Sequence, residues 1–303
     1  MSQRGTGVLA YIVAAFSISW TLWYGLARQG WEPGSSDLRW AVLQGAFAPA
    51  LAAIAVRLWV DKGFGDAGLR LNLRRSWKYY LLAWFLPLPG AALVLLLAQV
   101  FGLAEVDWTF RSGLATLTAP EGGAAPDMPG PWALVMFSLA SAAITMPILF
   151  GEEFGWRGYL QQRIFRGGRG KPVIAAVVTG CIWSLWHLPL NLQGYNFPGQ
   201  PVVGAAVFTV SCILLSVIFG WFLTASGSIW CASLAHASTN AVGASLVLLA
   251  TGGKPGIMAA YLGVLGWVPL GLLAAWIVAT GRLRPAPVEP PPAPGHEHEQ
   301  DVL

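Results

Sequence analysis

This chain is poor in charged residues. Only 11% of its 303 residues are Asp, Glu, Lys or Arg, and its mean hydropathy is +0.58. Soluble domains carry about 25% charged residues, so the composition excludes a soluble enzyme and predicts an all-α protein that crosses a membrane several times, in contact with membrane lipid. The net charge of +4 is modest and gives no indication of nucleic acid, so we expect no nucleic-acid partner.

Cysteine is also scarce. Cys181, Cys212 and Cys231 are the three cysteines, and all of them lie inside apolar runs. An odd number of cysteines in such a setting predicts buried free thiols rather than disulfides.

Apolar runs of about 20 residues, the length that crosses a bilayer, recur along the chain. The predicted spans, eight in number, lie at approximately 8–27, 39–60, 79–102, 132–165, 172–192, 202–224, 228–250 and 256–280. We expect one transmembrane helical domain over residues 1–284, a bundle of about eight helices. The proline-rich polar tail at 285–303 cannot build a core and is predicted to be disordered.

Lysine and arginine are distributed unequally between the two sides of the predicted membrane. If the N-terminus is cytoplasmic, 13 of the 18 basic residues fall on the inner side and 4 on the outer, and the remaining one is Arg157. This asymmetry predicts that both termini face the cytoplasm. Segments such as GWRG and WHLPLN are prokaryotic in style, so we expect a multi-pass protein of the prokaryotic plasma (inner) membrane.

Three charges interrupt the fourth predicted span, in the stretch Gly151–Tyr159, which reads GEEFGWRGY. A charge in the bilayer core costs about 2.5–3.5 kcal/mol on insertion scales, so such residues indicate function by default. Glu153 and Arg157 lie four residues apart on one helix face and can form an ion pair. Glu152 points about 100° away from that pair and remains available as a general base.

Two of the four histidines lie in predicted spans. His187 follows Trp183 by four residues, and His236 precedes Asn240 by four, so each pair shares a helix face. One membrane histidine alone is more often a satisfied interhelical hydrogen bond than a catalyst. However, the rise per residue, counted from the cytoplasmic helix ends, places both imidazoles at the level of Glu152. That convergence predicts hydrolysis, which needs a base for water and donors for an oxyanion.

The three motifs resemble those of the CPBP family of intramembrane proteases, the CAAX proteases and bacteriocin-processing (Abi) proteins, which includes the type II CAAX prenyl endopeptidases. GEEFGWRGY matches the family's EExxxR motif, and Trp183 to His187 resembles its FxxxH motif, with Trp in place of the usual Phe. HASTN, from His236 to Asn240, is similar to its HxxxN motif. The resemblance covers about residues 130–245, the motif-bearing core.

The resemblance implies a hydrolase, an intramembrane endopeptidase that cleaves a membrane-held substrate. The substrate would be a prenylated CaaX protein, or another peptide or membrane protein. The resemblance also implies that Glu152 activates water with help from His187. His236 and Asn240 would hold the oxyanion or orient the water.

The remaining predictions for the site concern Glu153, Trp183 and a metal ion. The resemblance gives Glu153 either a structural role beside Arg157 or a catalytic one, while Trp183 packs beside His187. Zinc on Glu152, His187 and His236 is one possible reading, because catalytic zinc sites use such a His₂Glu set. The sequence lacks the HExxH spacing, and similar family members run on Glu and His alone, so a metal-free mechanism is favoured.

Two other function classes compete with the protease interpretation. A proton-coupled transporter also uses carboxylates and histidines inside a bundle, but this chain has no internal repeat and no matching pair of broken helices. A catalytically idle scaffold or immunity protein is the other class. Such a protein has no need of Glu152, His187, His236 and Asn240 together.

Overall fold

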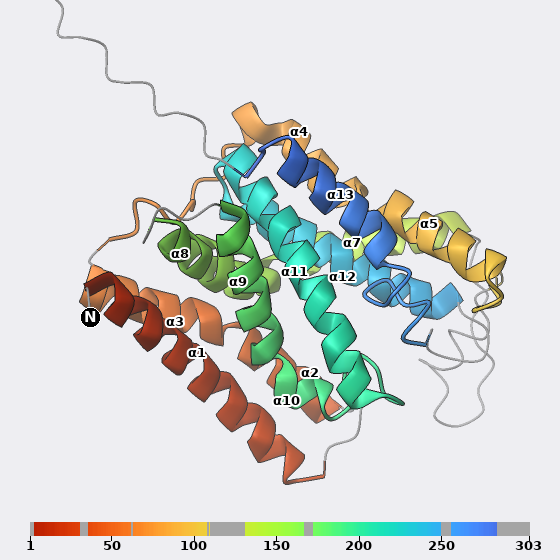
Figure 1. Cartoon of the computed structure of the whole chain (residues 1–303), viewed down its shortest axis with the longest axis horizontal. Helices are drawn as coiled ribbons and strands as arrows, with labels where there is room; N and C mark the ends of the chain where they lie inside the picture. The colour runs from red at the N-terminus through yellow and green to blue at the C-terminus, as the bar shows by residue number, and fades with distance from the viewer. Residues whose placement is uncertain are drawn as a thin grey trace, which may run out of the picture.

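The computed structural model describes residues 3–30, 36–61, 63–107, 109, 131–166, 172–249 and 256–283. The regular elements of these residues are helices, as the composition predicts, and they pack into a bundle (Figure 1). The predicted tail at 285–303 lies outside the described residues, as does most of the loop before the fourth span.

The helices follow the predicted spans, several of which are divided in two. The α-helices are α1 (Gln3–Ala27), α2 (Ser36–Ala46), α3 (Ala48–Val56), α4 (Leu73–Phe85), α5 (Pro87–Val100), α7 (Pro131–Gly155), α8 (Gln162–Arg166), α9 (Pro172–Trp186), α10 (Leu188–Asn191), α11 (Pro201–Ser226), α12 (Ile229–Leu249) and α13 (Trp267–Ala279). Two π-helical turns continue α3 and α7, namely η1 (Arg57–Asp61) and η2 (Trp156–Gln161).

Five helical runs in the described part of the chain are long and apolar enough to cross a membrane. They are Gly5–Ala27, Trp40–Asp61, Leu73–Val100, Trp132–Phe165 and Pro201–Ser226. The apolar helices α9 and α13 are shorter, and α12 has 21 residues but includes His236 and several hydroxyl side chains. The prediction of a polytopic helical membrane protein is therefore confirmed.

The last predicted span is helical only in its second half. Residues 256–266 form turns, and the helix begins at Trp267. Two glycines allow this tight winding: a Cβ at Gly263 or at Gly266 would collide with backbone carbonyls, in the second case that of Tyr261. The apolar composition of the segment predicted a helix, but the close backbone contacts favour turns.

Prolines divide three of the predicted spans. Pro49, Pro87 and Pro189 each occupy the first or second position of a new helix, where a missing N–H group costs nothing. The division before Pro189 makes His187 the N-cap of α10. His187 therefore lies at a bend after Trp186 and not inside a continuous helix.

Helix α7, which carries the charged motif, packs against α12 on one side and α3 on the other. Its approach to the end of α2 and to α3 depends on glycine. A Cβ at Gly151 would lie 2.6 Å from the carbonyl oxygen of Ala46, and one at Gly155 would overlap Pro49 and lie 2.5 Å from the Tyr11 hydroxyl. Small residues four apart are typical of closely packed membrane helices.

The ends of several helices gather at one end of the bundle, to the left and top in Figure 1. The starts of α4 and α12 and the ends of α8, α11 and α13 lie there. Hydrogen bonds from Ile229 N to Gly68 O (2.9 Å) and from Asn72 Nδ2 to Ser226 O (3.1 Å) tie the loop before α4 to the α11–α12 turn. The Lys and Arg asymmetry predicts that this end faces the cytoplasm.

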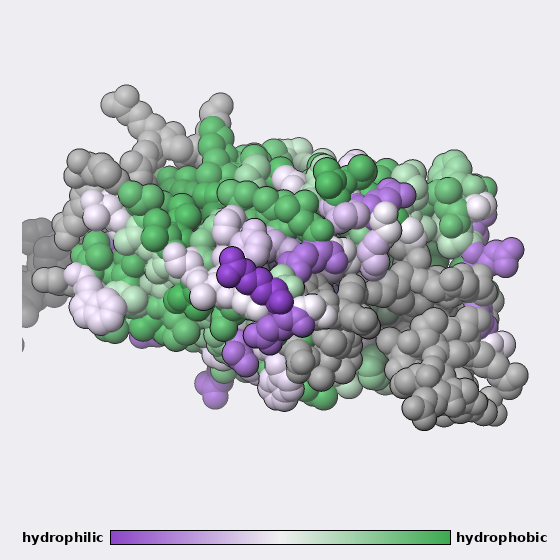
Figure 2. All heavy atoms as spheres, turned by 90° about the horizontal axis from the view of Figure 1, so that it is seen from below, coloured by the Kyte–Doolittle hydropathy of each residue, from purple (hydrophilic) through white to green (hydrophobic). Residues whose placement is uncertain are grey.

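The outer surface is rich in apolar side chains, which cover much of the face shown in Figure 2 around a hydrophilic group. Exposed tryptophans lie near both ends of the spans. Trp59 (76% exposed) and Trp77 lie at the predicted cytoplasmic end, and Trp40 and Trp132 (62% exposed) at the other. Such aromatic belts mark the two membrane–water interfaces, as expected for an integral membrane protein.

The three cysteines are free thiols, and no disulfide joins them. Cys212 and Cys231 are buried, as predicted. The prediction is wrong for Cys181, which is exposed. An apolar run in a membrane helix includes the face directed to lipid, and Cys181 lies on that kind of face of α9.

Candidate active site

Trp183 on α9 is the point at which residues of the three motifs meet. Its indole Nε1 donates a 2.8 Å hydrogen bond to Oε2 of Glu152 on α7. Its ring centroid lies 5.7 Å from that of His187 and 5.2 Å from that of His236 on α12. The structure therefore brings together the carboxylate and the two imidazoles that the helix rise places at one level.

One carboxylate oxygen of Glu152 accepts a hydrogen bond from the described part of the chain, and the other does not. Trp183 holds Oε2, whereas Oε1 accepts no hydrogen bond from the described residues. The side chain is only 7% exposed, so its surroundings have a low dielectric. This arrangement provides a carboxylate oxygen that can take a proton from a bound water.

Glu153 is used differently from its neighbour, since it joins two partners inside the bundle. Its Oε1 accepts hydrogen bonds from Arg157 (2.8 Å) and from Nδ1 of His236 (2.9 Å). The guanidinium of Arg157 lies 4.3 Å from the ring centroid of Trp183 and 5.1 Å from that of Phe219. The predicted Glu153–Arg157 pair is confirmed and is fully buried. Glu153 also orients the imidazole of His236, which the sequence did not predict.

The hydrogen bond of His187 fixes its ring. Nδ1 lies 3.0 Å from the carbonyl oxygen of Trp183. A carbonyl only accepts, so Nδ1 carries the proton and Nε2 of the neutral ring is an acceptor. The rings of Trp186 and Phe208, at 4.6 and 5.1 Å, enclose the imidazole. His187 is thus placed to accept a second hydrogen bond from water.

Asn240 lies one turn beyond His236 on α12, but it is not part of the buried cluster. Its side chain is exposed and makes no hydrogen bond with any residue in the described part of the chain. The amide is therefore free to bind a group that arrives from outside the protein.

The residues named for a metal do not form a metal site in this structure. Among the described residues, no three His, Cys, Asp or Glu side chains form a group that could hold a metal ion. One oxygen of Glu152 is on Trp183, and Nδ1 of each histidine is directed to another acceptor. These Nδ1 hydrogen bonds leave Nε2 of each histidine for another partner, and the mechanism proposed for this site uses no metal.

Two neighbours of the site were missed by sequence reasoning. Phe219 on α11 stacks on His236 with centroids 5.1 Å apart, and no sequence pattern distinguishes it from other apolar residues. Asn191 is 3% exposed, and its Oδ1 accepts a hydrogen bond from Asn196 (2.6 Å). A signal for Asn191 did exist, because HLPLN repeats the His-x-x-x-Asn spacing of HASTN.

Comparison with known proteins agrees with the motifs. Residues 128–242 match the family model described as "Type II CAAX prenyl endopeptidase Rce1-like". All three motifs lie inside this match. The chain is also 26% identical over 228 residues to "CAAX prenyl protease 2" of Methanococcus maripaludis, an alignment that covers 70% of this chain and 74% of that protein.

Proposed function

We propose that this relative of the CPBP family of CAAX proteases is an intramembrane endopeptidase in which Glu152 is the general base. The family relationship supports a CAAX-protease-like hydrolase. The observation that carries the mechanism is the placement of Glu152, with Oε2 fixed by Trp183 and Oε1 left over at the level of two imidazoles. A scaffold protein gains nothing from such a buried polar cluster.

In the proposed reaction, a water bound at Oε1 of Glu152 attacks the carbonyl carbon of the scissile bond and transfers its proton to that carboxylate. Nε2 of His187 accepts the second hydrogen bond of the water and aligns it. The C–N bond then breaks, and Glu152 returns the proton to the leaving amine. General base catalysis of this kind typically contributes about 10²- to 10⁴-fold to the rate.

The oxyanion that forms during the attack needs donors. The exposed amide of Asn240 lies on one face of α12 with His236, and we assign it to this task. Nδ1 of His236 already donates to Glu153, so Nε2 of the neutral ring is an acceptor and His236 is assigned to orienting the water. Removing one oxyanion donor typically costs about 10²- to 10³-fold in kcat. Glu153 and Arg157 are assigned a structural role, because both are fully buried and bonded to each other.

The proposed substrate is a prenylated CaaX-type peptide held in the membrane by its lipid. The support is the name of the Methanococcus relative, a CAAX prenyl protease, together with the apolar outer surface. An unprenylated peptide or membrane protein is the alternative substrate. We place the protein in the plasma membrane of a prokaryote, with its charged motif on the cytoplasmic half.

The test of this function uses purified protein in lipid vesicles with two reporter peptides, one farnesylated at a CaaX cysteine and one identical but unmodified. Mass spectrometry of the products identifies the cleaved bond. We expect cleavage after the farnesylated cysteine and little cleavage of the unmodified peptide. Preference for the unmodified peptide would overturn the substrate class, and cleavage of neither would favour an idle scaffold.

A separate experiment tests whether the protein binds a metal ion. Metal analysis of the purified protein and of its His187→Ala variant shows whether zinc is bound and whether His187 is needed to keep it. We expect no stoichiometric zinc in either protein. Zinc that copurifies at one ion per chain and is lost from the variant would replace the metal-free mechanism with a zinc-dependent one.

A further inference from the structure

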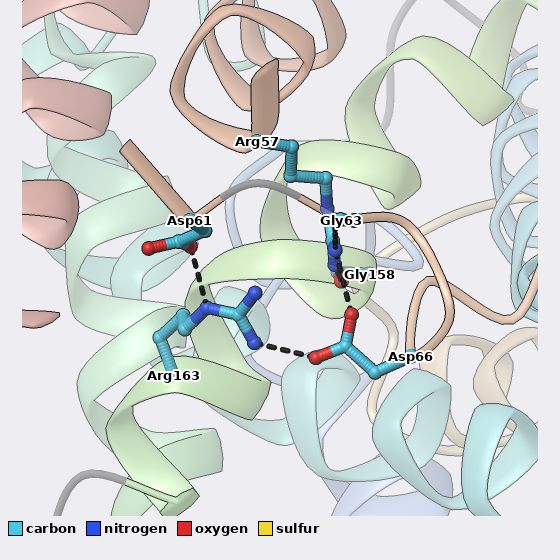
Figure 3. Close-up of polar contacts among 6 residues, drawn as sticks. All are labelled: Arg57, Asp61, Gly63, Asp66, Gly158 and Arg163. Atoms are coloured by element: carbon cyan, nitrogen blue, oxygen red, sulfur yellow. Dashed lines mark hydrogen bonds and ion pairs between the residues drawn. The ribbon is translucent and has the colours of Figure 1, made fainter. Parts of the chain in front are cut away.

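Arg57, at the predicted cytoplasmic end of the second span, is a fully buried arginine that contacts the motif stretch Gly151–Tyr159. Its NH2 group donates a 2.6 Å hydrogen bond to the backbone carbonyl of Gly158. Its NH1 group donates to Gly63 O (2.9 Å) and to Oδ1 of Asp66 (2.6 Å), as Figure 3 shows.

The guanidinium of Arg57 also lies against aromatic rings of the motif stretch. It is 5.9 Å from the ring centroid of Phe154 and 5.4 Å from that of Tyr159. Together with Gly158, three residues of the stretch therefore touch this side chain. Arginine suits such a place, because its planar group combines several hydrogen bonds with contact to aromatic faces.

The backbone that Arg57 holds is unusual. Residues Trp156–Gln161 form the π-helical turn η2, directly after the residues that carry the carboxylates. A π-helical turn is wider than an α-helical one, is rare, and occurs frequently at functional sites. The hydrogen bond from Arg57 to the Gly158 carbonyl lies inside this turn, so it favours the wide backbone over a regular α-helix.

Two hydrogen bonds from Arg163 hold the chain just after η2. Arg163, in α8 directly after η2, donates to Asp61 Oδ2 (2.8 Å) and to Asp66 Oδ2 (2.5 Å). Asp66 is thus shared by Arg57 and Arg163 (Figure 3). We call Arg57, Asp61, Asp66 and Arg163 the arginine–aspartate cluster. It ties η1 and the loop after it to the middle of η2 and to the start of α8.

We propose that Arg57 is a positioning residue for the motif helix: by holding the Gly158 carbonyl, it sets the π-helical turn and thereby the direction of Glu152, Glu153 and Arg157. Arg57 touches no substrate in this proposal. The effect on catalysis rests on the proposed peptidase function, but the effect on the backbone does not.

The main variant is Arg57→Lys. Lysine keeps the positive charge, but a single ammonium group cannot reproduce the planar fork that joins Gly158, Gly63 and Asp66. Asp66→Asn is a milder second variant, because it keeps Arg57 in place and removes one charged partner. Arg75→Ala is a matched control, since Arg75 is an exposed basic residue at the same end of the bundle.

The first readout is hydrogen–deuterium exchange of the η2 amides in the purified proteins, which needs no substrate. We expect exchange at Trp156–Gln161 to increase at least about tenfold in Arg57→Lys, less in Asp66→Asn, and not in the control, while exchange elsewhere in α7 and α12 stays unchanged. Unchanged exchange at η2 in Arg57→Lys, or an equal increase in all helices, would overturn the proposal.

The second readout is cleavage of the farnesylated reporter, given that the wild type cleaves it. Misdirected catalytic groups lower kcat more than substrate binding, so we expect kcat of Arg57→Lys to fall about tenfold or more while KM changes less than about twofold. Full kcat in a variant whose η2 exchange has increased would show that the turn does not position the site. A wild type that cleaves nothing would overturn the proposed function and leave the exchange result standing.

Discussion

At the scale of single residues, the bond between Trp183 and Glu152 sets this chain apart from the motif that it resembles. Phe, the usual residue of the FxxxH motif, provides a ring but no N–H group. Trp183 provides both, since its ring lies beside two histidines and Arg157 while Nε1 holds the carboxylate. The substitution thus adds a hydrogen bond to the group that we assign as the base.

We predict that Trp183→Phe lowers kcat about 10- to 100-fold with little change in KM. The variant keeps the aromatic contact and loses a hydrogen bond to a charged group, which is typically worth about 1.5–3 kcal/mol. Trp186→Phe is the matched control, because the Nε1 of Trp186 has no hydrogen-bond partner in the described residues. Steady-state kinetics of both variants test this prediction. Equal activity of the two would contradict a role for the Trp183 hydrogen bond.

Arg157→Ala is predicted to lower the yield of folded protein. The change leaves the fully buried carboxylate of Glu153 without its cation and removes the contacts with Trp183 and Phe219. Breaking a buried ion pair in this way costs about 3–5 kcal/mol. Gel filtration and thermal unfolding in detergent, with Arg75→Ala as the exposed control, measure the effect. A variant as stable as the wild type would show that the pair contributes nothing to the fold.

At the scale of helices, the close approach of α7 to α3 holds the charged motif in place. Gly155 lies against Pro49 and the Tyr11 hydroxyl, with no room for a methyl group. The π-helical turn η2 follows immediately, so a shift of α7 at this point also moves the carboxylates.

We therefore predict that Gly155→Ala destabilises the protein by about 1–3 kcal/mol, the usual cost of overpacking. Gly271→Ala in α13 is the control, because an added Cβ at Gly271 would meet no atom within 4 Å. The measurement is the midpoint of thermal unfolding in detergent. If both variants unfold at the wild-type temperature, the helices separate more easily than the packing indicates.

The sequence predicted much of this arrangement of helices, and its failures have local causes. The apolar runs located the spans, and the spacing of Glu153 and Arg157 predicted their pair. The bend at His187 was missed although Pro189 signals it, and the turns at 256–266 depend on close contacts of Gly263 and Gly266 with backbone carbonyls of the same segment, which an apolar composition does not reveal.

The sequence predicted the depth at which the site residues lie along their helices, but not the hydrogen bonds between them. Counting the rise along each helix placed Glu152, His187 and His236 at one depth. It gave no information on how far each helix is rotated, and rotation decides which side chains meet. The bonds from Trp183 to Glu152 and from His236 to Glu153, as well as the contact of Arg57 with η2, therefore appear only in the structure.

At the scale of the whole molecule, the arginine–aspartate cluster joins the end of the second span that is predicted to face the cytoplasm to the motif helix. Partial burial alone would raise the pKa of Asp66, but hydrogen bonds from Arg163 and Arg57 outweigh burial and lower that pKa from 3.8 to about 2. A carboxyl whose pKa is lower in the folded state stabilises the fold above its unfolded pKa and loses that contribution as the pH falls through the folded one.

We predict that wild type unfolds at a higher temperature than Asp66→Asn at about pH 7, and that the difference shrinks as the pH falls from 3.8 toward 2. Thermal unfolding of both proteins across this range measures the difference. A difference that stays constant down to the lowest pH would show that the charge of Asp66 is not what joins these segments.

The proposed role of Glu152 as the base of a peptidase is tested by a comparison of two proteins. Wild type and Glu152→Gln are reconstituted in the same lipid and given the farnesylated CaaX reporter. Glutamine matches the shape of glutamate and still accepts the Trp183 hydrogen bond through its carbonyl oxygen, so the fold should persist while the proton acceptor is lost. We expect cleavage by the wild type and at least about a 10²-fold lower rate for the variant. Equal cleavage by the two proteins would contradict this role of Glu152.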